Sequence, residues 1–130
     1  MKINRGREAG QPSEERGPTF TGTVLADPVL RTSAGVTVNT VMFPPGARTH
    51  WHTHETGQIL IVTHGRGLAV NAAGDGGEIL PGDVVWFQAG ERHWHGGAPD
   101  SYVTHIAISL GATSWEDAVT DEQYGAGPGR

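Results

Sequence analysis

The stretch GARTHWHTHETGQILIVTHG, residues 46–65, carries histidines at three alternating positions, His50, His52 and His54, and an apolar run that begins at Gln58. Alternation with a period of two residues is typical of a β-strand, in which every second side chain points to the same face. The intervening ETG supplies a turn between two such strands. The pattern predicts a β-hairpin that brings Gln58 beside the histidines.

Short runs with a similar strand-like pattern occur along the chain from residue 19 to residue 110. They include TFTGTVL, GVTVNTVMF, GLAVN, EILPGDVVWF, RHWHGG and SYVTHIAISL, with Gly, Pro, Asn and Asp between them. FPPGA cannot lie in a central strand, and NAAGDGGE offers glycines for hairpin positions. We predict an all-β fold, a sandwich or barrel of the jelly-roll kind. The large tryptophans and the run at residues 84–87 are expected in its core.

A helical pattern occurs once, in TSWEDAVTDEQY. Thr113 or Ser114 can cap the helix, acidic residues occupy its first turn, and Trp115 and Val119 lie four apart on one face. We expect one short C-terminal helix there, packed outside the barrel.

The chain is expected to form a single domain over residues 18–125. Residues 1–17 are charged and nearly free of large apolar side chains, which predicts a flexible N-terminal arm that could become ordered on a partner subunit. Residues 126–130 are rich in Gly and Pro, which predicts a frayed tail.

Composition limits the classes of function. A net charge of −5 without a basic run gives no sign of a basic surface that could bind nucleic acid or an anionic membrane. A small molecule is therefore the expected partner. The absence of cysteine excludes disulfides, thiolate nucleophiles and iron–sulfur sites. The N-terminus lacks the apolar segment of a secretory signal, and no apolar run is long enough to span a bilayer, which predicts a cytoplasmic protein.

The histidines can form a metal site. Residues two apart on a strand have Cα atoms roughly 6.6 Å apart, a span that the imidazoles of His52 and His54 can close around one ion. His50 lies on the order of 13 Å from His54 along a strand, which places it at the rim or on the surface. In RHWHGG, His93 and His95 share the face of another strand, reached through a second expected hairpin, and His93 could supply a fourth ligand.

These motifs resemble those of the cupin superfamily. The first cupin motif is met with every spacing kept and glutamine in place of the usual glutamate, at Gly46, His52, His54, Gln58 and Gly65. The second is met in part, at Gly82, Gly90 and His93, with Gln88 and Gly97 where proline and asparagine are usual. The resemblance implies a double-stranded β-helix with a metal inside it. The implied ligands are His52, His54, Gln58 and His93.

A narrower resemblance covers most of the chain. FTGTV, the stretch at residues 46–67, PGDVVWFQAGERHWHGGAP, THIAI and VTDEQY are similar to small bacterial cupins that include manganese-dependent hydroxynitrile lyases, which also carry the glutamine. The resemblance implies one divalent metal, with Mn ahead of Fe, Ni, Co or Zn, and cleavage of cyanohydrins to aldehyde and cyanide. It also implies a homodimer, which uncovered edge strands favour. Asn39, Val41 and Ser109 lie on strands that could line the pocket.

Neutral ligands leave a divalent ion its whole charge, so the predicted site attracts anions and suits Lewis-acid catalysis. The general base could be His95, which shares a strand face with His93, or His105, which lies in an apolar strand. Each could instead orient a ligand or be a hydrogen-bonded barrel residue. His64 is expected to face solvent, and Thr49 to be an exposed turn residue.

Other functions remain open at this point. The same site with Fe or Ni could serve a quercetinase-like dioxygenase, which binds an enolised substrate and oxygen together. A metal-assisted isomerase or polyketide cyclase would use the ion to acidify a carbon beside a carbonyl. A non-catalytic binding cupin is the alternative outside the enzymes.

Overall fold

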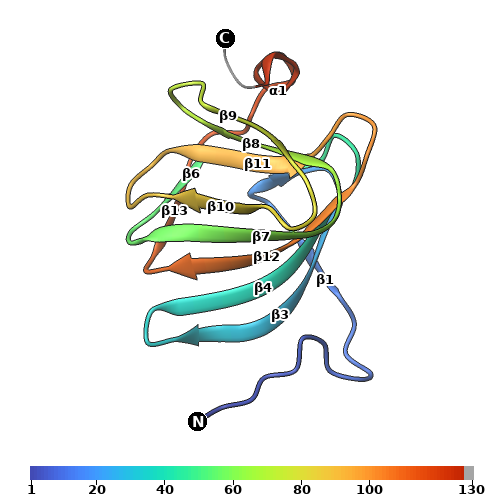
Figure 1. Cartoon of the computed structure of the whole chain (residues 1–130), viewed down its shortest axis with the longest axis vertical. Coiled ribbons are helices and arrows are strands. Elements are labelled where there is room, and N and C mark those ends of the chain that lie inside the picture. Colours follow the sequence, from blue (N-terminus) through green and yellow to red (C-terminus); the bar gives the residue numbers. More distant parts are fainter. Residues whose placement is uncertain (128–130) are drawn as a thin grey trace.

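The computed structural model describes residues 1–127 and shows two curled antiparallel sheets that close into a barrel, with one short helix outside it (Figure 1). The elements are β1 (Glu14–Arg16), β2 (Phe20–Thr21), β3 (Val24–Ser33), β4 (Val36–Phe43), β5 (Arg48–Thr49), β6 (His52–His54), β7 (Gly57–Gly65), β8 (Gly67–Asn71), β9 (Gly76–Ile79), β10 (Val84–Phe87), β11 (His93–Gly97), β12 (Val103–Leu110), β13 (Thr113–Trp115) and α1 (Asp121–Ala126). The expected jelly-roll barrel with one short C-terminal helix is confirmed.

Each sheet contributes one wall of the barrel. The first has the strand order β1-β3-β4-β12-β7-β10, and the second has β13-β6-β11-β5-β2 with β8 and β9 joined beside β11. β12 pairs along its full length with β4 on one side and β7 on the other. These three strands therefore form the rigid centre of the first wall.

The two expected hairpins around the histidines are wrong. β6 pairs with β11 and β13, whereas β7 pairs with β10 and β12, so the turn after His54 carries the chain from one sheet to the other. The connection from β10 to β11 crosses in the same way. Because such a turn forms a corner of the barrel, His54 and Gln58 belong to different sheets and are not neighbours in one ladder.

The interior has an apolar end and a polar end. At one end the inward row of the first wall contains Phe43 on β4 opposite Val103 on β12. At the other end the matching row is Thr37, Ser109 and Gln58 on β4, β12 and β7. Three neighbouring strands thus change from apolar to polar in the same direction, which leaves room for a polar pocket at one end.

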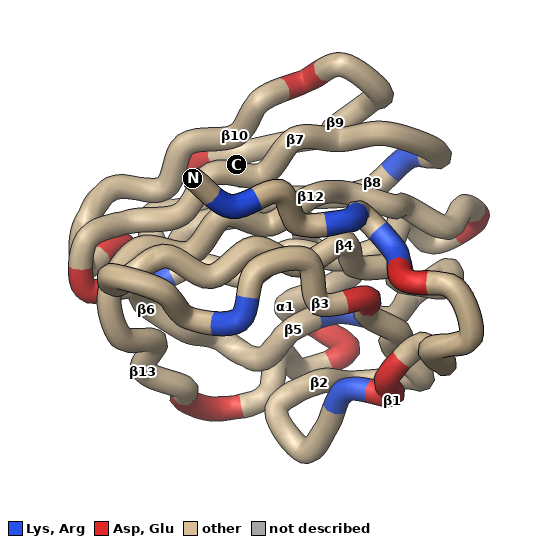
Figure 2. Tube along the Cα trace, turned by 90° about the horizontal axis from the view of Figure 1, so that it is seen from below, with Lys and Arg blue, Asp and Glu red and all other residues tan. Residues whose placement is uncertain are grey.

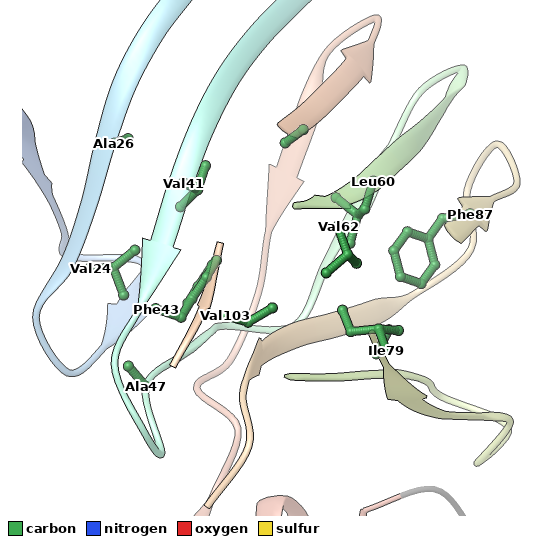
Figure 3. Close-up of a cluster of buried hydrophobic side chains, with 12 residues drawn as sticks. Val24, Ala26, Val41, Phe43, Ala47, Leu60, Val62, Ile79, Phe87 and Val103 are labelled. Carbon is green, nitrogen blue, oxygen red and sulfur yellow. The ribbon is translucent and has the colours of Figure 1, made fainter. Parts of the chain in front are cut away.

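A hydrophobic cluster fills the apolar end, where its side chains meet between the two walls (Figure 3). Its buried members are Val24, Ala26, Val41, Phe43, Ala47, Leu60, Val62, Ala69, Ile79, Phe87, Val103 and Ala107. Full burial of a Val, Leu or Phe side chain contributes about 1.5–3 kcal/mol. This cluster holds the strands that present the polar pocket.

The helix begins later than the sequence pattern predicts. α1 is capped by Thr120, whose side chain accepts from the backbone of Gln123, and the side chain of Gln123 reaches back to the Thr120 backbone. Thr113 instead begins strand β13, which pairs with β6. Helix propensity is overridden here because β6 needs a hydrogen-bonded neighbour on its second edge.

Part of the expected N-terminal arm belongs to the barrel. β1 forms the edge of the first sheet by pairing with β3, and Arg7 contacts Asp27 on β3. The expected tail at residues 126–130 mostly lies outside the described residues, and its first residue, Ala126, ends α1.

Two of the four tryptophans lie outside the core. Trp51 and Trp94 are 7% and 1% exposed, as expected, but Trp115 is 40% and Trp86 is 52% exposed. β10 is not a buried strand either, because Val84 is 64% exposed on the same outward face as Trp86. Within residues 1–127, no helix has the length and apolar character needed to cross a membrane.

Candidate metal centre

Four side chains from three strands meet at the polar end of the barrel. His52 and His54 come from β6, and His93 comes from β11, directly opposite His52 in the ladder. The ring centroid of His52 lies 4.2 Å from that of His93 and 5.0 Å from that of His54. Gln58 approaches from β7 in the opposite wall, with its Oε1 3.1 Å from Nε2 of His93. All four are buried. The structure therefore brings together the four residues that the cupin resemblance implies as ligands.

Backbone carbonyls orient two of these imidazoles. Nδ1 of His52 lies 2.9 Å from the carbonyl oxygen of His50, and Nδ1 of His93 lies 2.7 Å from that of Glu91. A carbonyl oxygen can only accept, so each Nδ1 carries the proton and donates it. Each Nε2 is left with a free lone pair, which is the tautomer that metal-bound histidines commonly adopt.

Gln58 presents its oxygen to the same centre. Its Nε2 donates to Oγ of Ser109 at 3.1 Å, which turns Oε1 toward Nε2 of His93. Both facing atoms are then acceptors, and two acceptors at this distance lack a proton to share. Nε2 of His54 is also buried without a hydrogen-bond partner, while its Nδ1 bonds Oγ1 of Thr113. Nitrogen and oxygen donors arranged in this way fit a divalent transition metal.

His95 also lies close to this centre. Ligand atoms of His52, His93 and His95 are all within 4.8 Å of one another. The contacts of the imidazoles differ: Nε2 of His93 faces Oε1 of Gln58, whereas Nδ1 of His95 lies 3.0 Å from Nε2 of His105 on β12. His95 is thus tied to a second histidine behind the centre, which the other three imidazoles do not contact in the described structure.

Burial keeps the converging histidines neutral. It lowers the pKa of His93 to about 3 and that of His54 to about 4, and it holds the pKa of His52 well below its usual value. Histidine must be deprotonated to bind a metal. The site is therefore ready to bind a cation without first losing protons at neutral pH.

A second histidine pair lies behind the first group. Nε2 of His105 on β12 is 3.0 Å from Nδ1 of His95 on β11, and both side chains are buried. Burial lowers the pKa of His105 to about 4 and lowers that of His95 as well. Nε2 of His95 and Nδ1 of His105 have no hydrogen-bond partner in the described residues. His95 lines the pocket and His105 does not.

The pocket has a volume of about 310 Å³. Its lining includes the predicted positions Asn39, Val41 and Ser109, together with His52, His54, Gln58 and His95. It also includes residues that the sequence pattern does not single out, among them Arg16, Phe20, Thr37, Thr113 and Trp115. Local sequence carries no signal for them, because Arg16 and Trp115 reach the pocket only through the pairing of β1 and β13.

The expectation that Thr49 is an exposed turn residue is wrong. Its side chain is 1% exposed and accepts from the backbone N–H of His95 at 3.3 Å, so it is a buried strand residue at the pocket and not an exposed turn residue. His50 is half-buried and His64 is exposed, as predicted.

His105 makes the metal-free protein sensitive to acid. Its pKa is 6.5 in an ordinary environment and about 4 in the fold, so between these values the unfolded chain binds a proton that the folded chain excludes. Stability from this residue is present above pH 6.5 and is lost as pH falls toward 4, on the order of 3 kcal/mol in all. We expect calorimetry of the metal-free protein to show this fall. His105→Gln should flatten the curve and His64→Gln should not, whereas equal curves for both variants would contradict the assignment.

A family model described as the cupin domain matches residues 39–108, which is more than half of the chain. The chain is a cupin. It is 49% identical over 132 residues to a protein of Granulicella tundricola named (R)-mandelonitrile lyase, with 95% of this cupin and 98% of that relative covered.

Solved structures support the same fold. The cupin superposes on the crystal structure of a cupin-like protein from Thermotoga maritima with a TM-score of 0.81 and 37% identity, covering 90% of this chain and 95% of the other. The polyketide cyclase RemF from Streptomyces resistomycificus gives a TM-score of 0.73 at 17% identity, covering 95% and 91%. At that identity the second likeness concerns the fold alone.

Proposed function

We propose that this cupin is a metal-dependent lyase that cleaves cyanohydrins reversibly to an aldehyde and cyanide. The observation that carries the proposal is the pair of facing acceptors, Nε2 of His93 and Oε1 of Gln58, in a buried cluster of neutral imidazoles. Such a cluster of acceptors fits a bound cation, and neutral ligands would leave that cation its full charge. The name of the Granulicella tundricola relative supports the reaction class.

The proposed metal ligands are His52, His54, Gln58 and His93. The ion is one divalent transition metal, with Mn the first choice and Fe, Ni, Co or Zn the alternatives, since nitrogen and oxygen ligands suit all of them. When bound, the ion supplies Lewis acidity that lowers the pKa of a hydroxyl group and stabilises departing anions. His95 is left out of the proposed ligand set because its Nδ1 contacts Nε2 of His105 and because the cupin motifs imply the other four residues.

The proposed general base is His95. If its Nδ1–H donates to Nε2 of His105, the lone pair on Nε2 of His95 is free toward the metal cluster, where a substrate hydroxyl would lie. Its lowered pKa keeps the imidazole neutral and able to accept a proton. His105 holds the required tautomer and orientation of His95, much as a carboxylate orients the histidine of a catalytic triad. The same imidazole can return the proton to cyanide.

The direct experiment mixes the untagged protein with mandelonitrile, after elemental analysis and with or without added Mn. We expect aldehyde to form above the uncatalysed rate, faster with the metal and slower after a chelator. No aldehyde above background in any metal-loaded sample would overturn the proposed reaction.

Ser109 gives a prediction about the metal site itself. Its hydroxyl bonds the amide nitrogen of Gln58, so Ser109→Ala removes the contact that turns Oε1 toward the imidazoles. We expect Mn affinity to fall roughly tenfold, the lower end of the effect of losing an outer contact to a ligand. Titration of free Mn by EPR measures this without catalysis.

Two further variants make that test specific. Ser109→Thr keeps the hydroxyl and should restore affinity. In a Gln58→Glu background the two carboxylate oxygens are equivalent, so Ser109→Ala should have a smaller effect there. Equal losses in both backgrounds would show that Ser109 does not act by orienting the amide.

We also propose that the protein is a homodimer joined through the outer face of the first sheet. Trp86 and Val84 on β10 are exposed beside Ile59 and Ile61 of β7, and Ile108 of β12 continues the row. A continuous apolar row across three strands is typical of a covered face. Light scattering should give the mass of two chains, and Trp86→Ser should shift it toward one. A wild-type monomer would contradict the proposal.

A further inference from the structure

We propose that the natural substrate of this pocket carries a carboxylate at the end away from the metal, and that Arg16 binds it. The inference rests on the proposed metal site but goes beyond the reaction, because it names the chemical class of the substrate. Mandelonitrile itself has no such group. Arg16 is the one Lys, Arg, Asp or Glu side chain among the pocket-lining residues that the structure describes.

The charge of Arg16 is only partly neutralised. Its Nη1 donates to Oε1 of Glu14 at 3.2 Å, but the other oxygen of Glu14 accepts from Arg31 at 2.7 Å. Hydrogen bonding and charge from Arg31, with help from Arg16, hold the pKa of Glu14 below its usual value, so the carboxyl is ionised. Two guanidinium groups therefore share the one carboxylate of Glu14, at an edge where basic and acidic segments adjoin near β1 (Figure 2).

Asn39 offers a second hydrogen-bond donor in the pocket beside Arg16. Its Oδ1 accepts from Nη2 of Arg16 at 3.4 Å, because a guanidinium can only donate. The amide nitrogen of Asn39 is then the group left for a ligand in the pocket that both residues line. A carboxylate is an acceptor on both oxygens, so it matches one charged and one neutral donor.

The separation between this donor pair and the metal site suits a flat organic group. Asn39 lies on β4 and Gln58 on β7, with β12 between them and two residues of offset along the strands, which corresponds to about 12 Å between their Cα atoms. Aromatic side chains flank the pocket: the ring centroids of Phe20 and Trp115 are 5.4 Å apart, and that of Trp115 is 4.6 Å from that of His52. An aryl ring with the reacting group at one end and a carboxylate at the other would span this distance between apolar walls.

Binding of two matched probes tests the proposal without turnover. Benzohydroxamate chelates a metal through its hydroxamate, and 4-carboxybenzohydroxamate adds the distal carboxylate. We expect calorimetric titration of the metal-loaded protein to show about tenfold tighter binding of the carboxylated probe, as one charge-assisted contact allows. Arg16→Gln should reduce that preference to about one while leaving the affinity for benzohydroxamate unchanged, and Arg16→Lys should keep part of it.

Glu14→Gln separates anion binding from a structural role of Arg16. If Arg16 only anchors β1, then Arg16→Gln and Glu14→Gln both break the same ion pair and change the preference in the same direction. If Arg16 binds the carboxylate, Glu14→Gln removes a competing negative charge and should raise the preference. Equal binding of the two probes by the unmodified protein, or changes of the same sign in both variants, would overturn the proposal. Neither result depends on whether mandelonitrile is cleaved.

Discussion

A His54→Ala variant is expected to lose the metal, with affinity reduced by more than about 100-fold because removal of a ligand should exceed the cost of losing an outer contact. Nε2 of His54 is buried without a partner, and its pKa of about 4 keeps it neutral and able to coordinate. Elemental analysis of the purified variant, followed by titration with Mn, measures the loss. The lyase activity should disappear with the metal.

His95→Asn is the matched control for this experiment. It also replaces a buried imidazole near the centre, but one that contacts His105 and is left out of the proposed ligand set. We expect this variant to keep its metal. If His95→Asn lost the metal and His54→Ala kept it, the ligand set would be His52, His93 and His95 with Gln58 in a lesser role.

The same His95→Asn variant is expected to lose turnover by a factor of about 10² to 10⁴, the usual contribution of a general base. An asparagine side chain cannot accept the substrate proton at neutral pH, while the pocket and the metal remain. Steady-state cleavage of mandelonitrile by the metal-loaded variant gives the comparison. The change should fall on kcat more than on KM, because the base acts on the transition state.

His105→Asn tests the role given to the second histidine. It breaks the 3.0 Å contact that orients His95 but leaves the base in the pocket, so we expect a smaller loss than in His95→Asn. The double variant should be no worse than His95→Asn alone. A larger loss from His105→Asn than from His95→Asn would make His105 the base and contradict the assignment.

The convergence of the proposed ligands on β6 could be predicted because it depends on local spacing. His52 and His54 lie two apart on a strand, and that parity alone turns both imidazoles to one face. Both are buried, and the half-buried His50 was set apart by its distance along the strand, because its parity is the same. Gln58 was predicted to lie beside them, and it does, although by a turn between sheets instead of a hairpin.

The errors share a physical cause. The start of the helix, the partners of β6 and the burial of Trp86 depend on which strands pair, and pairing is a contact between residues far apart in the chain. Local propensity competes with those contacts and loses where a strand edge needs hydrogen bonds. Charged residues before residue 17 indicated disorder, yet β1 is paired because β3 offers an open edge.

The sequence by itself indicated the β-rich barrel through alternation and turn residues, while the resemblance of its motifs to those of cupins implied the proposed ligand set, and strand parity suggested the candidate bases. Only the tertiary structure decided how the amide of Gln58 is turned, that His105 stands behind His95, and that Arg16 reaches the pocket. These arrangements depend on side chains meeting across the barrel from strands distant in sequence. The local sequence pattern determines which side chains share a strand face, and the packing of the two sheets determines which of their atoms face one another.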